Sequence, residues 1–182
     1  MPLADGRPHM LPRDWGLAAA AAALLLDQAS KLTLLYGFHF KALGEAAAPG
    51  IYSVPVLPFF NIAMVWNPGV SYGLFPAHSR LGSALLVLLS LVAVVVLGWW
   101  LWVSKRRTLT VGLGLIIGGA IGNNLIDRLI YGKVADFFHF YVFGYSWYVF
   151  NVADAAITFG VIALLYDALM RPETHPGPET TG

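Results

Sequence analysis

Hydrophobic residues gather in four long stretches, at about residues 15–36, 81–103, 108–130 and 149–170. A bilayer core about 30 Å thick requires roughly 20 residues of helix, so each stretch is long enough to cross it. The second stretch, LGSALLVLLSLVAVVVLGWWLWV, has no charged residue and ends in tryptophans, which is typical of a lipid-facing helix that reaches the membrane interface. The pattern therefore predicts four transmembrane helices.

Two other kinds of segment lie between and around these stretches. Residues 37–80 include IYSVPVLPFFNIAMVWNPGVSYGLF, which is rich in β-branched and aromatic residues and is interrupted by Pro and Gly. This composition favours short strands and turns that form a small sheet on the membrane surface. The polar ends, at about 1–14 and 172–182, are expected to lack fixed structure. The whole chain, 1–182, is then one membrane-embedded domain.

Basic residues flank the stretches unevenly and predict their orientation. They precede the first stretch, join the second to the third and follow the fourth, at Arg7, Arg13, Lys105, Arg106, Arg107 and Arg171. The positive-inside rule then places both termini in the cytoplasm, and 37–80 and 131–148 on the other side. The predicted fold class is a mainly α, polytopic membrane protein with a small β-rich extracytoplasmic segment.

Composition excludes several classes of function. The 182 residues are 58% hydrophobic and 12% charged, with a net charge of +1, so no basic surface for nucleic acid is expected. Cysteine is absent, which excludes disulfides, thiolate metal sites and a thiol nucleophile. The five histidines show no zinc-binding spacing, so neither a metal nor another cofactor is expected.

Acidic residues in the hydrophobic stretches are the main candidates for chemistry. An ionised carboxylate at mid-bilayer costs about 2.5–3.5 kcal/mol even on the lenient insertion scale, so each one needs an explanation. Four lie inside or at the edge of a stretch and a fifth follows one closely, namely Asp27, Asp127, Asp154, Asp167 and Asp136.

Two of these acids have structural interpretations that compete with a catalytic one. Asp27 and Lys31 are four residues apart and share a helix face, so they predict either a buried pair that docks the first helix or a direct role in chemistry. Asp154 follows Asn151 by three residues, which is the spacing of a helix cap.

Asp127 and Asp136 lie around the end of the third stretch. Asp127 is at the negative end of the helix dipole, where Arg128 is a candidate to neutralise it. Asp136, in KVADFFHF, is either a solvated loop acid or part of a site. The link 131–148 is short enough to hold both acids near Asp154. Two carboxylates in contact share a proton, so that one acts as acid and the other as base, as in aspartyl proteases.

Four blocks of sequence resemble bacterial signal peptidase II, the lipoprotein signal peptidase family. They are DQASK at 27–31, NPGVSYGLF at 67–75, GNNLIDRLIYGKVADF at 122–137 and FNVADAAI at 150–157, and the resemblance extends over about 15–170. It implies an inner-membrane aspartyl endopeptidase, active near the periplasmic face. This enzyme hydrolyses the peptide bond just before the lipidated Cys of diacylglyceryl-modified prolipoproteins, with membrane lipids around it and no cofactor.

The same resemblance implies roles for individual residues. The catalytic aspartates fall on Asp136 and Asp154. The supporting and substrate-binding polar positions fall on Asp27, Lys31, Asn67, Asn124, Asp127, Arg128 and Asn151.

One motif departs from the family, which usually reads G-N-x-x-D-R where this chain has GNNLIDR. Either Asn123 replaces the glycine, or the helix carries an insertion. The three-residue spacing of Asn124 and Asp127 favours the first interpretation, with Asn124 as the functional amide.

Two other classes of protein remain as alternatives. A small proton-coupled transporter also has charged residues in its membrane helices, although it needs them along a path through the bilayer. Here the second stretch has none and the acids gather chiefly near one face. A non-catalytic assembly subunit would tolerate the loss of Asp136 or Asp154 without chemical consequence.

Overall fold

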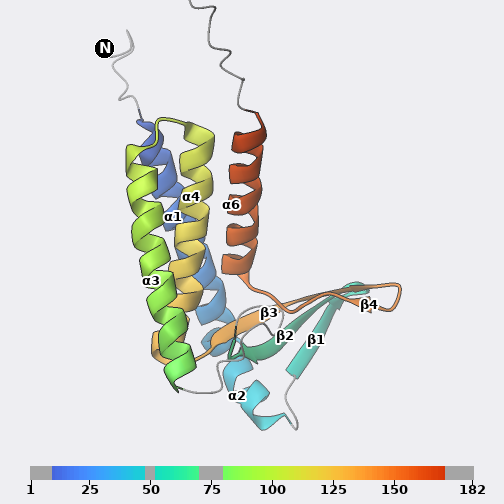
Figure 1. Cartoon of the computed structure of the whole chain (residues 1–182). Helices are drawn as coiled ribbons and strands as arrows, with labels where there is room; N and C mark the ends of the chain where they lie inside the picture. Colours follow the sequence, from blue (N-terminus) through green and yellow to red (C-terminus); the bar gives the residue numbers. More distant parts are fainter. Residues whose placement is uncertain (1–9, 48–51, 70–79, 171–182) are drawn as a thin grey trace, which may run out of the picture.

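Helix α4, Arg107–Ala120, lies at the centre of a helical bundle in the computed structural model, which describes residues 10–47, 52–69 and 80–170 (Figure 1). It packs against α1, α3 and α6. Four helical segments are long and apolar enough to cross a membrane, at Pro12–Gly37, Leu81–Val103, Arg107–Tyr131 and Val152–Leu169. The four predicted spans are therefore confirmed, with ends that shift by at most three residues.

The ends of the spans follow local chemistry. Helix α1, Pro12–Leu32, begins inside the segment expected to be an unstructured tail, because Pro12 occupies a first-turn position and Asp14 accepts the N–H of Leu11 at 2.8 Å. It continues as a π-helical turn, Thr33–Gly37. Helix α6, Val152–Leu169, starts three residues later than expected because Asn151 caps it. The outer parts of both predicted tails, 1–9 and 171–182, lie outside the described residues.

Close backbone contact joins α1 to α4. A Cβ atom on Gly114 would lie 2.0 Å from the carbonyl oxygen of Gly16, so a larger residue there would push the helices apart. Helix α3, Arg80–Val103, instead exposes apolar side chains such as Leu88, Val92 and Val96 along its length. This exposure agrees with its interpretation as a lipid-facing span.

A four-stranded antiparallel sheet lies at one end of the bundle, in the order β1, β2, β3, β4. Its strands are β1 Tyr52–Leu57, β2 Phe60–Asn67, β3 Val134–Val142 and β4 Tyr145–Ser146, and a short helix, α2 Phe40–Ala46, precedes them. Strands β1 and β2 confirm that residues 37–80 contain short strands; residues 48–51 and 70–79 of this segment lie outside the described part. Strand β3 was not predicted, and neither was α2.

The sheet is held to the bundle by a small apolar core. Leu34 and Leu35 at the end of the first span and Phe40 of α2 pack there against Met64 of β2, together with Ala135 and Phe137 of β3. Alternate residues of a strand point to opposite faces. The core that takes Ala135 and Phe137 therefore directs Asp136, between them, to the other face.

Candidate active site

Asp154 lies in the first turn of α6, where it takes part in a reciprocal cap. Its main-chain N–H donates to Oδ1 of Asn151 at 3.0 Å, and its Oδ2 accepts from the main-chain N–H of Asn151 at 3.2 Å. The capping interpretation is therefore confirmed. It does not use the whole carboxylate, because Oδ1 accepts from the amide of Asn123 at 2.8 Å.

Asp136 is buried on β3, with 3% of its surface exposed, so its interpretation as a solvated loop acid is wrong. Two amides donate to its carboxyl group, Asn151 to Oδ1 at 2.6 Å and Asn67 to Oδ2 at 3.2 Å. Burial raises the pKa of Asp136 to about 8, and the negative charge of Asp154 adds to the shift. Asp136 therefore holds its proton at neutral pH.

Asn151 connects the two acids. Its main-chain N–H binds Asp154 and its side-chain amide binds Asp136, so one residue sets the position of both carboxyl groups. The same amide donates to the carbonyl of Ala135, which ties the start of α6 to β3. The expected proximity of Asp136 and Asp154 thus has a specific cause in the cap of α6 and the register of β3.

Lys31 lies behind this pair and is almost fully buried, with 2% of its surface exposed. Its three ammonium hydrogens have three acceptors, Asp27 Oδ2 and Asp127 Oδ2 at 2.8 Å each and Asn123 Oδ1 at 2.6 Å. The predicted pair of Asp27 and Lys31 is therefore part of a larger group. Asp127 pairs with Lys31, so the expectation that Arg128 neutralises it is corrected.

The two aspartates bound to Lys31 also hold the main chain beside the catalytic candidates. Asp27 accepts the N–H of Ala153 at 3.0 Å, and Asp127 accepts the N–H of Ala135 at 3.2 Å. Ala153 and Ala135 directly precede Asp154 and Asp136. Lys31 thus connects, through one carboxylate each, the helix that carries one candidate acid and the strand that carries the other.

A π-helical turn, Ile121–Asp127, determines which asparagine reaches the acids. Asn123 is buried and binds both Lys31 and Asp154, whereas Asn124 accepts from Nε of Arg128 at 3.2 Å. The choice of Asn124 assumed α-helical spacing, and that assumption is wrong here. A π-helical turn accommodates one more residue than an α-helical turn, which agrees with an insertion.

Gly122 supports the insertion. A Cβ atom at this position would lie 2.5 Å from Oδ2 of Asp27, so a larger residue would displace that carboxylate, which Lys31 and the N–H of Ala153 hold in place. The dipeptide Gly122-Asn123 then corresponds to the G-N of the family motif. The sequence reasoning weighed both asparagines and preferred Asn124, whereas the contacts with Lys31 and Asp154 are made by Asn123.

Gln28 is a residue that the sequence reasoning missed. Its amide donates to Asp27 at 3.0 Å and to Asp127 at 3.3 Å. It lies inside the DQASK block, but a side chain one position from Asp27 shares no α-helical face with it, so spacing gave no signal.

Arg128 and Asn67 hold the chain that leaves β2. The guanidinium of Arg128 donates to the carbonyls of Pro68, at 3.0 Å, and Gly69. Oδ1 of Asn67 accepts the N–H of Gly69 at 3.0 Å, which leaves its amide hydrogens for Asp136. Both residues therefore belong to the site, and the rest of the NPGVSYGLF block, from residue 70, lies outside the described residues.

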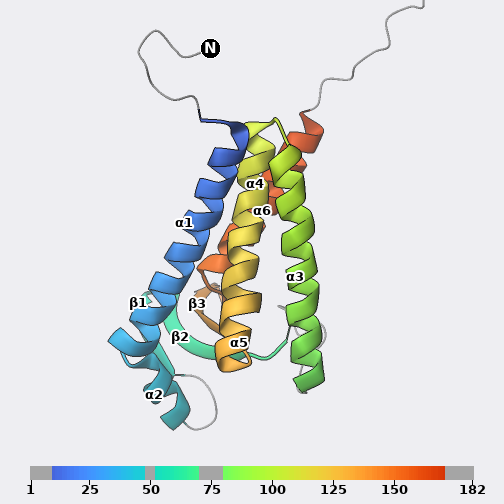
Figure 2. The same ribbon diagram turned by 90° about the vertical axis from the view of Figure 1, so that its left-hand side faces the viewer.

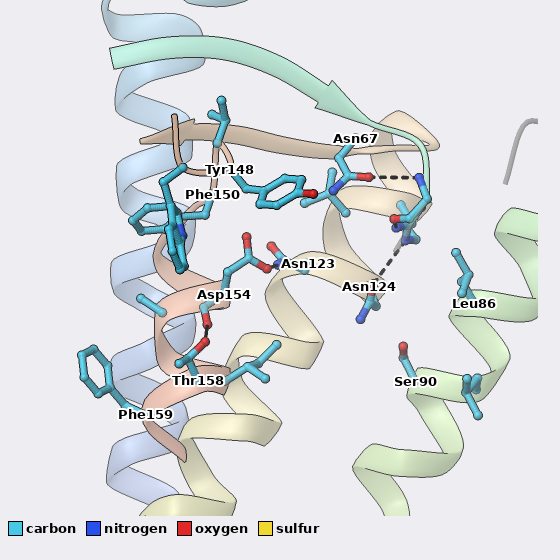
Figure 3. Close-up of a pocket in the computed structure, with 18 residues that line it drawn as sticks. Asn67, Leu86, Ser90, Asn123, Asn124, Tyr148, Phe150, Asp154, Thr158 and Phe159 are labelled. Carbon is cyan, nitrogen blue, oxygen red and sulfur yellow. Dashed lines mark hydrogen bonds between the residues drawn. The ribbon is translucent and has the colours of Figure 1, made fainter. Parts of the chain in front are cut away.

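A cavity of about 740 Å³ opens beside the acids. Figure 3 shows Asp154 and Thr158 of α6 on one side, Leu86 and Ser90 of α3 on the other, and Asn123 between them. Other lining side chains are mostly apolar, such as Leu89, Val134, Phe150, Ile157 and Phe159. The cavity is therefore a mostly apolar groove with the carboxylate of Asp154 in its wall.

Comparison with known proteins finds similar proteins over most of the chain. The sequence model described as signal peptidase (SPase) II matches residues 19–170. Lipoprotein signal peptidases of Nitrobacter hamburgensis and Rhodopseudomonas palustris are each 50% identical to the chain over 173 residues, which is 93% of this chain and 100% of theirs.

A solved bacterial membrane enzyme has the same fold. It superposes with a TM-score of 0.71 at 25% identity, covering 92% of this chain and 99% of its own. The family match extends over most of the chain and includes every residue of the site described above, and so the chain belongs to the signal peptidase II family of proteases.

Proposed function

We propose that the protein is an aspartyl endopeptidase that removes the signal peptide of diacylglyceryl-modified prolipoproteins, cutting just before the lipidated Cys. Its relatives are named lipoprotein signal peptidases, which supports cleavage of prolipoprotein signal peptides and does not favour a transporter. The observation that carries the aspartyl mechanism is the double contact of Asn151 with Asp136 and Asp154.

The two acids have different environments, which assigns their roles in the proposed reaction. Asp154 lines the cavity, and as a carboxylate it removes a proton from the attacking water. Asp136 is buried with a pKa of about 8, and its carboxyl proton goes to the carbonyl oxygen as the tetrahedral intermediate forms. Collapse breaks the C–N bond, the proton on Asp154 passes to the leaving nitrogen, and a hydroxyl of the intermediate returns its proton to Asp136 as the carbonyl re-forms.

The proposed orientation places this chemistry at the periplasmic side of the inner membrane. Figure 2 shows the start of α1, the α3–α4 connection and the end of α6 at one end of the bundle, and the sheet at the other. The connection carries Lys105, Arg106 and Arg107, which the positive-inside rule assigns to the cytoplasm. The sheet, with Asp136, then lies outside.

The groove between α3 and α6 suits an apolar substrate. Its walls are mostly apolar, and α3 exposes apolar side chains along its length, so a signal helix and acyl chains can enter from the bilayer without crossing water. Recognition is then chiefly hydrophobic, and membrane lipids are the surrounding partners.

The test of the function uses the purified protein in phosphatidylglycerol-containing vesicles with a precursor peptide that carries a diacylglyceryl Cys. We expect a single product whose N-terminal residue is that Cys, as measured by mass spectrometry, and no product from the precursor without lipid. Loss of turnover in EDTA would contradict the metal-free mechanism. Absence of cleavage, or a cut at another bond, would overturn the proposed function.

The pH dependence of kcat/KM tests the role of Asp136. Because the raised pKa keeps the acid form up to about pH 8, activity is expected to fall as the pH rises through that value. The amide of Asn67 stabilises the charged form of Asp136, so Asn67→Leu should move the falling limb upward by about one pH unit. If the fall of kcat/KM occurs at the same pH in Asn67→Leu as in the parent, the ionisation that causes it belongs to a group other than Asp136.

A paired comparison of the two asparagines tests the π-helical turn. Asn123→Leu removes a hydrogen bond to the carboxylate of Asp154, and it should lower kcat by roughly 10- to 100-fold, the cost of about 1.5–3 kcal/mol for such a bond. Asn124→Leu, the matched control one residue away, should change kcat little, since its amide contacts Arg128. The opposite order of the two effects would restore Asn124 as the functional amide.

A further inference from the structure

The hairpin formed by β3 and β4 ends in aromatic side chains that are open to the surroundings. Phe143 at its tip is 96% exposed, and Tyr145 and Trp147 are 81% and 64% exposed. No Asp, Glu, Lys or Arg occurs from residue 137 to residue 153. Such a concentration of exposed aromatic surface without charge is costly in water and marks a contact surface.

The turn places a bulky residue, Phe143, in a left-handed backbone conformation that such residues rarely adopt. Phe143 and Gly144 have φ values of 49° and 80°, as the two central residues of a two-residue hairpin turn often do. Asn or Gly adopts this left-handed conformation readily, whereas a bulky residue adopts it only under strain. The phenyl ring of Phe143 makes no contribution inside the fold that offsets this strain, because it is almost fully exposed. Its contact therefore lies outside the chain.

The position of the hairpin points to lipid as that contact. Figure 1 shows it projecting sideways from the end of α6 where the sheet begins, across the direction of the helices. Helix α6 is a membrane span whose exposed face includes Phe159 and Ile162. A hairpin that leaves the end of this span sideways lies over the lipid that surrounds it.

We propose that the tip of this hairpin, Val142–Tyr145 with Trp147, inserts into the boundary between lipid headgroups and acyl chains beside α6. Tyr and Trp are the residues that favour this boundary, and an uncharged tip needs no anionic lipid. Strand β3 carries both Asp136 and this tip. Insertion therefore fixes the height of the site relative to the membrane surface, independently of which bond the protein cleaves.

The absence of Cys from the chain makes a depth measurement direct. Phe143→Cys and Tyr145→Cys, each with a nitroxide label, are reconstituted in phosphatidylcholine vesicles. Relaxation by oxygen, which is enriched in lipid, is compared with relaxation by a water-soluble nickel chelate. The control is Glu45→Cys, an exposed charged position on α2, the helix at the lower end of the molecule in Figure 1. We expect the oxygen-to-nickel ratio at both hairpin positions to exceed the control several-fold and to be unchanged by anionic lipid.

A second comparison separates the ring from the turn. Asn suits the left-handed backbone, so Phe143→Asn keeps the hairpin and removes only its apolar tip. In a Tyr145→Cys background it should lower the ratio toward the control value. Ratios equal to the control at both labelled positions would overturn the proposal. So would spin–spin broadening between labels, because it would show that a second copy of the chain covers the tip.

Discussion

Asp154→Asn is expected to lower kcat for precursor cleavage by about 10³-fold or more, and Asp136→Asn by a similar factor, since each removes one half of an acid–base pair. Asparagine keeps the size of each side chain and one acceptor oxygen, and the cap bond from the main-chain N–H of residue 154 to Asn151 does not depend on the carboxylate, so the start of α6 should persist. The measurement is single-turnover cleavage of the lipidated precursor, with substrate binding checked separately. The double variant should be no slower than either single variant, because the two groups act as a unit.

Asp167→Asn is the matched control for these variants. Asp167 is also a buried acid of α6, but it lies at the other end of the helix, where its Oδ2 pairs with Arg106 at 2.8 Å. Its replacement should leave the chemical step unchanged even if it lowers stability. Full activity of Asp136→Asn or Asp154→Asn would remove that residue from the catalytic pair, whereas equal loss in Asp167→Asn would indicate damage to the fold rather than to the chemistry.

The four spans could be predicted from sequence because the bilayer imposes a long apolar run on any helix that crosses it. Asp154 was harder, since the spacing from Asn151 predicts a cap as well as a catalytic residue. In the structure the cap uses only one carboxylate oxygen of Asp154 and leaves the other to accept from Asn123. The side-chain amide of Asn151 likewise donates to Asp136. The spacing of Asn151 and Asp154 predicts the cap, but it contains no information about Asp136 on β3.

Asp136 illustrates a contact that local pattern does not contain. The segment VADFFHFYV has the β-branched and aromatic residues of a strand, but the same residues also suit a loop at the membrane interface. Its pairing with β2, in which Val65 lies opposite Asp136, joins residues about 70 positions apart. That non-local pairing buries the acid. The short link 131–148 indicated that Asp136 lies near Asp154, and the family resemblance pointed to its catalytic role.

Asn123 shows the limit of helical periodicity. An α-helical wheel places Asn124 with Asp127, and the prediction followed it. Asn123 is four residues from Asp127, a spacing that also shares an α-helical face, and in the π-helical turn it is Asn123 that meets the same ammonium group of Lys31 as Asp127. The extra residue in GNNLIDR is therefore better explained by the additional residue of a π-helical turn than by replacement of the motif's glycine.

Lys31→Met is expected to destabilise the protein by about 3–5 kcal/mol, the cost of removing one partner from a buried ion pair. Methionine has a similar length and fits the site, so the loss arises from charge rather than from a cavity. Asp27 and Asp127 would remain buried at 0% exposure without a counter-ion. The measurement is the free energy of unfolding in mixed micelles with increasing denaturing detergent. Lys41→Met, a cation of α2 that lies over the ring of Tyr36, is the control and should change stability by less than about 0.5 kcal/mol.

The cause of the loss can be tested through pH and through a second substitution. Protonation of either stranded carboxylate removes a charge that has no partner, so the difference between Lys31→Met and the parent should narrow as the pH falls. Asp127→Asn in the Lys31→Met background removes one such charge and should restore part of the stability, while Asp127→Asn alone should lower it. Because Asp27 and Asp127 hold the N–H groups of Ala153 and Ala135, cleavage by folded Lys31→Met should also be slow. A stability loss that is independent of pH and not relieved by Asp127→Asn would assign Lys31 a packing role instead of an electrostatic one.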